Sequence, residues 1–265
     1  MRRFLTAAAI AAFASSACAA LTYDFRSVTE GMAHTTISGR VSIDAGKMRM
    51  DMVHGDGTLF HDNSVILSTD GGKTLRVLDP SNKTYYDMTA DQLVGSADAT
   101  LKQLGASLAI ANQKVNVVDQ GDAGKIEGYP TTKSRIDLSY DMNVDLMGQK
   151  VTTHMDMTTE NWTTDRIGAE YTNFLQLKGT HTGIEGIDKV LEAESGALKN
   201  RFPLKQVATV KINAMGRQIV TTTTSAVTGI STASVPADRF TMPTGYTKTD
   251  NPLDRMMTKA AGAPK

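Results

Sequence analysis

The segment at residues 135–147 reads RIDLSYDMNVDLM, and from residue 135 to residue 146 its polar and apolar residues alternate without a break. Successive side chains of a β-strand point to opposite faces, whereas side chains of a helix return to one face every 3.6 residues. The alternation therefore predicts a strand with one apolar and one polar face. The apolar face consists of Ile136, Leu138, Tyr140, Met142, Val144 and Leu146.

Glycine turns join this strand to others of the same kind. Gly148 follows it directly, and residues 151–160 resume the alternation. A second pair of alternating runs, 207–215 and 219–227, flanks Gly216. Because glycine supplies the positive φ that tight turns require, both pairs are predicted to be antiparallel hairpins.

The N-terminal third contains shorter runs with the same alternation. They are separated by Gly, Asp, Asn and Pro, which are typical turn residues. In the third run, Met48, Met50 and Met52 share one face. The predicted strands are 21–28, 35–43, 47–53, 64–69, 74–78 and 84–88.

Helical spacing interrupts the strand pattern in two places. One helix is predicted near 91–111, where apolar residues recur every three or four positions. A second is predicted over 183–200, because Thr182 and Glu185 form a capping box before an apolar stripe. Residues 165–177 could form a shorter third helix. The apolar stripe of the first helix consists of Ala97, Leu101, Leu104, Leu108 and Ala111.

These elements predict a mainly β (α+β) fold. Consecutive hairpins imply an antiparallel sheet of about eleven strands, and two to three amphipathic helices each need one covered face. A strongly curved or half-barrel sheet with the helices on its concave side meets both requirements. No linker divides the chain, so residues 20–250 are predicted to form one domain, and the polar residues 251–265 a flexible tail.

The first nineteen residues have the features of a secretory signal peptide. Arg2 and Arg3 precede an apolar run that is too short to span a membrane, and Ala17 and Ala19 form an A-x-A cleavage site. Residues 1–19 are therefore expected to be removed and the protein to be periplasmic, with no integral membrane span. The alternative is a lipoprotein modified at Cys18. Cleavage is favoured over it, because a lipoprotein signal has a leucine-type residue three positions upstream of the cysteine.

Composition excludes some partners and stabilising features. The chain has 28 Lys and Arg against 28 Asp and Glu, and no basic cluster, so nucleic acid is not an expected partner. Cys18 is the only cysteine and lies within the leader, which leaves the mature protein without disulfides. Its stability must therefore come from a packed core.

No catalytic or metal site is predicted. The nearest histidine pair, His54 and His61, flanks a loop with Asp56 and Asp62, but their spacing is not that of a metal site. Alternation places acidic residues of the 135–147 strand on its solvated face, where a Ca²⁺ site is not expected. The sequence contains no G-x-S-x-G elbow and no phosphate-binding loop. We therefore expect a non-enzymatic protein without cofactors.

Methionine is the one unusual feature of the composition, with 14 residues against seven Phe and one Trp. Its flexible, polarizable side chain suits both irregular cores and surfaces that accept varied apolar partners. Two interpretations stay open, an ordinary core poor in aromatics or an adaptable ligand-binding cavity. The methionines on predicted inner faces, our candidate ligand-binding residues, are Met48, Met50, Met52, Met142, Met155 and Met157.

Several fragments, taken in order, resemble uncharacterised periplasmic proteins related to the outer-membrane lipoprotein carrier, the LolA-like superfamily. The resemblance implies an unclosed β half-barrel whose mouth is filled by helices, and a cavity that characterised members use for acyl chains. No ligand-contact residue of the carrier matches a position in this chain. The fragments are GKMRMDM at 46–52, VLDPSNKTY at 77–85, EGYPTTK at 127–133, TENWTT at 159–164 and VPADRFTMPTGY at 235–246.

Two functions are compatible with this sequence. The first is a periplasmic protein that binds or carries an apolar ligand, such as an acyl chain, a lipid or a lipidated partner, in a half-barrel cavity. The second is a cell-envelope protein-interaction or assembly factor whose barrel interior is filled by its own side chains. The sequence leaves the oligomeric state open.

Overall fold

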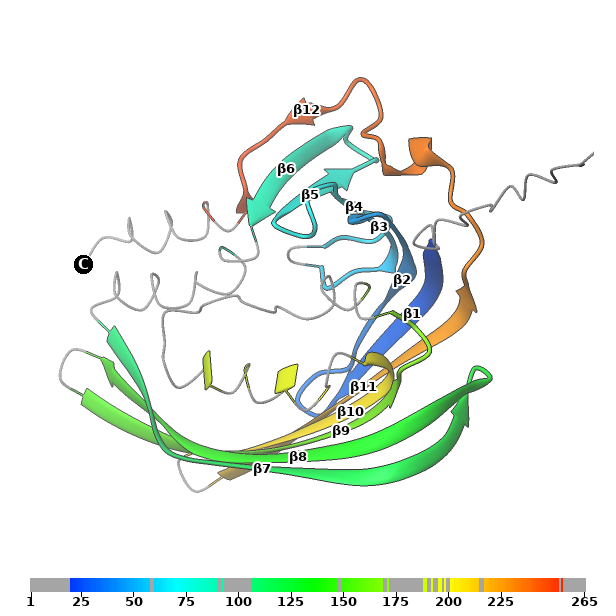
Figure 1. The fold of residues 1–265 in the computed structure, drawn as a ribbon. Coiled ribbons are helices and arrows are strands. Elements are labelled where there is room, and N and C mark those ends of the chain that lie inside the picture. Colours follow the sequence, from blue (N-terminus) through cyan, green and yellow to red (C-terminus); the bar gives the residue numbers. More distant parts are fainter. Residues whose placement is uncertain are drawn as a thin grey trace, which may run out of the picture.

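The computed structural model is built around one large β-sheet (Figure 1). It describes residues 20–57, 60–89, 106–146, 149–168, 201–214 and 217–252, and in addition residues 92, 171, 188, 189, 192, 195, 196, 198 and 254.

The strands of the N-terminal half are short and follow one another closely along the chain. They are β1 (Leu21–Glu30), β2 (Thr35–Asp44), β3 (Lys47–His54), β4 (Val65–Ser68), β5 (Thr74–Asp79) and β6 (Thr84–Thr89).

The strands of the C-terminal half are longer. They are β7 (Ala106–Ile126), β8 (Tyr129–Leu146), β9 (Gln149–Thr164), β10 (Phe202–Ala214) and β11 (Arg217–Ser231), followed by the 3₁₀ turn η2 (Ala237–Phe240) and the two-residue strand β12 (Thr247–Lys248).

The twelve strands form one sheet in the order β12-β6-β5-β4-β3-β2-β1-β11-β10-β9-β8-β7. Two antiparallel meanders, β1–β6 and β7–β11, join where β1 pairs with β11. The sheet is strongly curved and does not close, because β7 and β12 lie at its opposite edges (Figure 1). The predicted mainly β, curved and antiparallel architecture is therefore confirmed, with twelve strands in place of about eleven.

The register identifies one continuous face that lines the concave side. Directly paired residues of neighbouring strands point to the same side of a sheet. Tyr23 pairs with Val41, Val41 with Met50, Met50 with Ile66, and Ile66 with Val77. Tyr23, Val41, Ile66 and Val77 belong to the main buried cluster, and the partly buried Met50 packs against it. The other members of the cluster are Leu21, Ile43, Met48, Met52, Met88, Ile167, Tyr171, Phe202, Leu204 and Val227.

The C-terminal segment packs on the convex side of β3–β6. Arg239 Nη2 lies 2.7 Å from Asp51 Oδ2, which ties η2 to β3. Met242 and Tyr246 cover a second apolar cluster formed by Val65, Leu67 and Leu78. Beyond them β12 runs parallel to β6, and its Thr247 N–H donates to the carbonyl of Lys83 at 2.9 Å. This segment fastens the end of the chain across the back of the N-terminal meander.

The helix predicted near 91–111 is wrong from residue 106 onward, where β7 begins. Leu108 pairs with Val144 and Ile110 with Met142, so this stretch continues the sheet beyond β8. Leu108 and Ile110 also fit the two-residue period of a strand. Because β8 is long and pairs with this stretch, the strand is selected over the helix. Of the earlier part of the predicted helix, only residue 92 lies among the described residues.

No helix of seven or more residues occurs among the described residues, so the predicted covering helices are not seen there. Most of the predicted helix 183–200 lies outside the described residues, although the six described between 188 and 198 have helical backbone. They lie inside the curve of the sheet (Figure 1). Residues 165–168, at the start of the third predicted helix, are not helical, and most of its remainder is not described.

The termini are described only in part. The predicted signal peptide, residues 1–19, lies outside the described residues, as does most of the predicted tail 251–265. Asn251, the first residue of that tail, is buried, and its side-chain amide lies 3.5 Å from the carbonyl oxygen of Asp87. No helix within the described part of the chain has the length and apolar character to cross a membrane.

Candidate functional site

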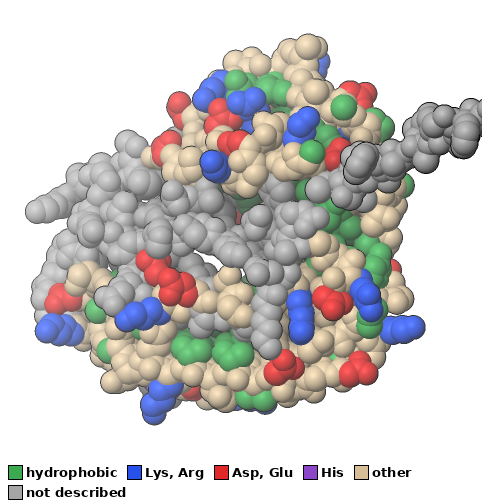
Figure 2. All heavy atoms as spheres, in the orientation of Figure 1, with side chains coloured by type: hydrophobic (Ala, Val, Ile, Leu, Met, Phe, Trp, Pro, Cys, Tyr) green, Lys and Arg blue, Asp and Glu red, His purple; other side chains and the backbone are tan. Residues whose placement is uncertain are grey.

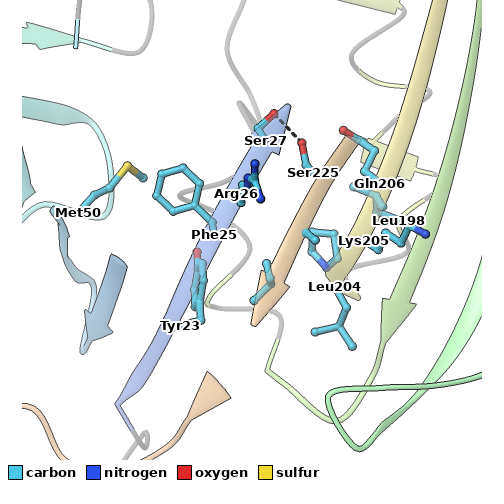
Figure 3. A pocket seen from close by; sticks show the side chains of 13 residues that line it. Tyr23, Phe25, Arg26, Ser27, Met50, Leu198, Leu204, Lys205, Gln206 and Ser225 are labelled. Carbon is cyan, nitrogen blue, oxygen red and sulfur yellow. Dashed lines mark hydrogen bonds between the residues drawn. The ribbon is translucent and has the colours of Figure 1, made fainter. Parts of the chain in front are cut away.

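A cavity of about 270 Å³ opens on the concave side, where the two meanders join. Its walls come from β1, β3, β10 and β11, and Leu198 lines it from the inner side of the curve (Figure 3). Most of its lining is apolar. The apolar side chains are Tyr23, Phe25, Met50, Leu198, Pro203, Leu204, Ala226 and Val227.

Strand alternation and one irregularity in β10 build the wall of this cavity. Tyr23 and Phe25 are two positions apart in β1 and so face the same side. The register between β9 and β10 shifts between Pro203 and Lys205, beside Leu204, which is fully buried. Next to it, the Phe202 ring meets the Tyr23 ring edge to face, with 5.4 Å between ring centroids. This contact locks β1 to β10 across β11.

The opposite part of the cavity is polar. The Ser225 hydroxyl donates to Ser27 Oγ at 2.9 Å, across the β1–β11 pair (Figure 3). Gln206 Nε2 donates to Asn161 Oδ1, also at 2.9 Å. Arg26 and Lys205 also line the cavity, although the Lys205 ammonium lies over the Trp162 ring. The cavity therefore changes from apolar to polar along its length.

The hydroxyl of Tyr23, a residue of the apolar part of the cavity lining, is unusual. Its side chain is fully buried, and its hydroxyl has no hydrogen-bond partner among the described residues. Burial raises the pKa of this hydroxyl well above its ordinary value. The group therefore stays protonated at any physiological pH and keeps a hydrogen to donate.

The six candidate methionines share the concave face but fall into two groups. Met50 lines the cavity, while Met48 and Met52 are 3% and 4% exposed in the core beside it. Met142, Met155 and Met157 are half-buried on β8 and β9. Because β3 and β9 are five strands apart in the sheet order, the groups are separated by roughly 24 Å along the sheet. Ligand binding by these six residues stays a prediction.

Sequence reasoning missed most of the cavity lining. Tyr23, Phe25, Leu204 and Val227 lie in or beside strands that the sequence predicted, and the alternation in β1 identifies the inward face of Tyr23 and Phe25. The pairing of β1 with β11, about 200 residues away in sequence, brings these side chains together. No local pattern reports such a pairing.

A second hollow, of about 560 Å³, lies near the ends of β1, β2 and β3, and most of the residues that line it are polar. Its lining includes Arg26, His34, His54 and Asp62, with His54 Nδ1 3.9 Å from Asp62 Oδ2. The carboxylates of this loop shape its backbone, because Asp62 accepts the N–H of Gly55 at 2.9 Å. Asp56 accepts the N–H of Phe60 at the same distance. Among the described residues no group of three or more His, Cys, Asp or Glu side chains could hold a metal ion.

One histidine on the convex face is held between carboxylates. His154 Nδ1 lies 2.6 Å from Asp141 Oδ1, and its Nε2 lies 3.4 Å from both Ser139 Oγ and Asp156 Oδ1. The hydrogen bond to Asp141 raises the pKa of His154, which then holds its proton more firmly. These contacts hold the imidazole ring in place on the convex face, outside the cavity lining.

Charges of both signs are interspersed over the visible surface. In Figure 2, basic and acidic side chains alternate around the sheet without a large area of one sign. Many are paired on the convex face, as in Arg40 with Asp24 and Arg76 with Asp87, each at 2.7 Å. This surface does not favour a polyanionic partner.

The only tryptophan, Trp162, lies on the convex face between two lysines. Lys133 Nζ and Lys205 Nζ are 4.6 and 4.7 Å from its ring centroid, within the range of cation–π contacts. Both lysines are its cross-strand partners, on β8 and β10. Trp162 therefore supports the outside of the sheet and does not line the cavity.

Solved structures similar to this chain share little sequence with it. An uncharacterized conserved protein from Thermus thermophilus has 8% identity and a TM-score of 0.37, over 88% of this chain and 90% of that one. A LolA superfamily protein from Nitrosomonas europaea has 8% identity and a TM-score of 0.32, over 85% and 91%. A DUF1329 family protein from Desulfovibrio piger has 5% identity and a TM-score of 0.31, also over 85% and 91%.

The LolA-like likeness predicted from the sequence is thus also found among solved structures. At these TM-scores it carries no statement about ligand or activity. No functionally curated protein matches the chain. The model of one family, described as a domain of unknown function, matches residues 28–246, which is most of the chain. The chain therefore belongs to the DUF4412 family.

Proposed function

We propose that this chain is a non-enzymatic periplasmic protein that binds an apolar ligand in the concave cavity between the two meanders. The ligand class is an acyl chain, a lipid or a lipidated partner. The observation that carries the proposal is the cavity itself, whose apolar walls of Tyr23, Phe25, Met50 and Leu204 lie beside a well-packed core. Binding sites for small molecules are typically apolar hollows with a few polar groups.

The size of the cavity limits how much ligand it holds. Its volume of about 270 Å³ lies just below the ~300–1,000 Å³ range of typical ligand sites. Burying about five methylene groups there contributes roughly 4 kcal/mol at ~0.8 kcal/mol each. A longer acyl chain needs additional surface, and the half-buried Met142, Met155 and Met157 on the same concave face could supply it.

The filling of the N-terminal meander favours the second candidate function. Met48, Met52, Ile66, Val77 and Met88 are all nearly fully buried, so this part of the concave side is occupied by the chain's own side chains. A cell-envelope interaction or assembly factor would have such an interior throughout. The cavity beside Met50 distinguishes the two functions, because the factor needs no ligand there.

Export to the periplasm is part of the proposal. It rests on the predicted signal peptide and on the packing of the residues that follow it. Ala20 and Leu21, the first described residues, are 5% and 1% exposed. A chain that begins at Ala20 would therefore start directly in the core.

A titration with a fluorescent fatty acid tests ligand binding on delipidated mature protein. We expect saturable binding at micromolar concentrations, because transfer of the acyl chain outweighs the cost of ordering it. Met50→Lys places a charge in the cavity and should weaken binding at least tenfold. Met32→Lys is the matched control, since Met32 is 78% exposed and lies outside the cavity lining. Circular dichroism checks the folding of both variants.

The outcomes separate the two candidate functions. If wild-type protein shows no saturable binding up to the solubility limit of the probe, the ligand-binding proposal fails and the interaction factor takes its place. Equal weakening by Met50→Lys and Met32→Lys would place the binding site outside the cavity. Mass spectrometry of lipid extracts, from protein purified out of its native envelope, would then identify the natural ligand class.

A further inference from the structure

We infer that the ligand of the concave cavity carries an acyl carbonyl, as in a carboxyl or ester group, and that the Tyr23 hydroxyl donates a hydrogen bond to it. This inference rests on the proposed function and names the chemistry of its ligand. It distinguishes an acyl compound from a purely apolar molecule of similar size.

The first observation is the state of the Tyr23 hydroxyl. It is buried and has no hydrogen-bond partner among the described residues. The neutral polar side chains across the cavity differ in this respect, since Ser225 donates to Ser27 and Gln206 donates to Asn161. Buried polar groups in native proteins are nearly always paired, so an unpaired hydroxyl on a side chain that lines a cavity needs an explanation.

Packing alone does not explain a tyrosine at this position. The ring of Tyr23 meets Phe202 edge to face at 5.4 Å, and phenylalanine would make the same contact. It would also avoid the unfavourable burial of an unpaired hydroxyl. A ligand that supplies the missing partner turns this unfavourable group into a specific contact.

The protonation state of Tyr23 determines which ligand atom is complementary. Burial raises the pKa of the hydroxyl, so it remains an O–H donor and pairs with an acceptor. In Figure 3 the hydroxyl end of Tyr23 points along β1 towards Phe25, with Met50 across from that ring. The acceptor oxygen must therefore belong to an otherwise apolar part of the ligand. An acyl carbonyl attached to a hydrocarbon chain has this character.

The test compares wild-type protein with Tyr23→Phe. Lauric acid and methyl laurate are titrated as carbonyl-bearing probes, and the apolar fluorophore N-phenyl-1-naphthylamine as a probe that has no carbonyl. We expect Tyr23→Phe to weaken binding of both laurate probes about fivefold to tenfold, as for the loss of one hydrogen bond. The affinity of Tyr23→Phe for the fluorophore should stay within about twofold of the wild-type affinity, because the apolar walls of the cavity are unchanged.

Thermal unfolding of the ligand-free protein gives an independent readout. Because Tyr23→Phe removes an unpaired buried hydroxyl, Tm should rise by about 2–4 °C while laurate affinity falls. Tyr86→Phe is the control, since Tyr86 packs against the same core but does not line the cavity. It should leave affinity for all three probes unchanged.

Each outcome has one meaning. If wild-type protein binds none of the three probes, the proposed function itself fails. If it binds them and Tyr23→Phe binds the laurates with wild-type affinity, the inference fails and the proposed function stands. A fall in Tm on Tyr23→Phe would mean that the hydroxyl has a partner in the free protein, which also overturns the inference. If the two laurates respond differently, the affected one identifies an acid or an ester as the ligand.

Discussion

Replacing Leu138 by aspartate tests the orientation of the strand that defines the fold. Leu138 is 3% exposed on the concave face of β8, and its cross-strand partners Val115 and Met157 are apolar. The substitution therefore loses the burial of the leucine side chain. It also places a carboxyl where neither cross-strand partner carries an opposite charge. Asn143 lies on the other face of the same strand, where it accepts a hydrogen bond from the Thr152 hydroxyl at 2.7 Å.

The expected loss of stability has two parts. Fully burying a leucine side chain contributes about 1.5–3 kcal/mol, and this is lost. Burial raises the pKa of a carboxyl by up to ~3 units, which adds about 4 kcal/mol at neutral pH. The sum, roughly 5–7 kcal/mol, is comparable with the whole free energy of unfolding of a typical domain, about 5–15 kcal/mol. Asn143→Asp should change the free energy of unfolding by only about 0.5 kcal/mol, because the oxygen that Thr152 contacts is retained.

Urea unfolding followed by circular dichroism measures both variants. The folded-state pKa of the introduced carboxyl is raised, so its electrostatic cost is full above that pKa and disappears below the unfolded value of about 3.9. The difference in free energy of unfolding between Leu138→Asp and wild type should therefore shrink as the pH is lowered towards 4, until only the loss of leucine packing remains. Equal destabilisation by the two variants at neutral pH would refute the assignment of the concave face.

Three further predictions concern export, metals and the convex face. Intact-mass measurement of the protein in the periplasmic fraction should give a chain that begins at Ala20, and a diacylglyceryl mass on Cys18 would contradict the predicted cleavage. Chelator treatment should leave Tm unchanged, since His54, Asp56, His61 and Asp62 do not gather into a metal site; a drop of several degrees would reveal one. In an NMR titration His154 should show a raised pKa that falls in Asp141→Asn, because the hydrogen bond to Asp141 favours the protonated imidazole. The contribution of this hydrogen bond to stability is present below the ordinary histidine pKa of about 6.5 and is lost as the pH rises through the raised pKa. A His154 pKa that does not move in Asp141→Asn would contradict this prediction.

The sequence predicted the strands best where alternation was long. In the 135–147 segment Ile136 and Leu138 are buried as expected, and Asp137 is paired on the opposite face with Arg135, 2.8 Å away. The direction of a strand side chain depends only on its position in the strand, so local sequence reports it. For the same reason all six candidate methionines lie on the predicted face.

The sequence failed where two periodicities overlapped. Residues 106–111 contain Leu108 and Ile110 two positions apart, but Leu104, Leu108 and Ala111 also fit a helix. Pairing with β8 decides for strand, since β8 extends to Leu146 and its apolar residues Met142 and Val144 pair with this stretch. Tertiary context overrides local preference in such segments.

The sequence by itself determined the mainly β architecture, the inward faces of most strands and, through its single cysteine, the absence of a disulfide within the chain. Only the tertiary structure decided that β1 pairs with β11, that the Phe202 ring meets Tyr23, and that Met50 rather than Met142 borders the cavity. It also decided that the Tyr23 hydroxyl is left without a partner among the described residues. The physical reason is range: alternation and turn chemistry act between neighbours in the chain, whereas a cavity forms from side chains that non-local strand pairing brings together.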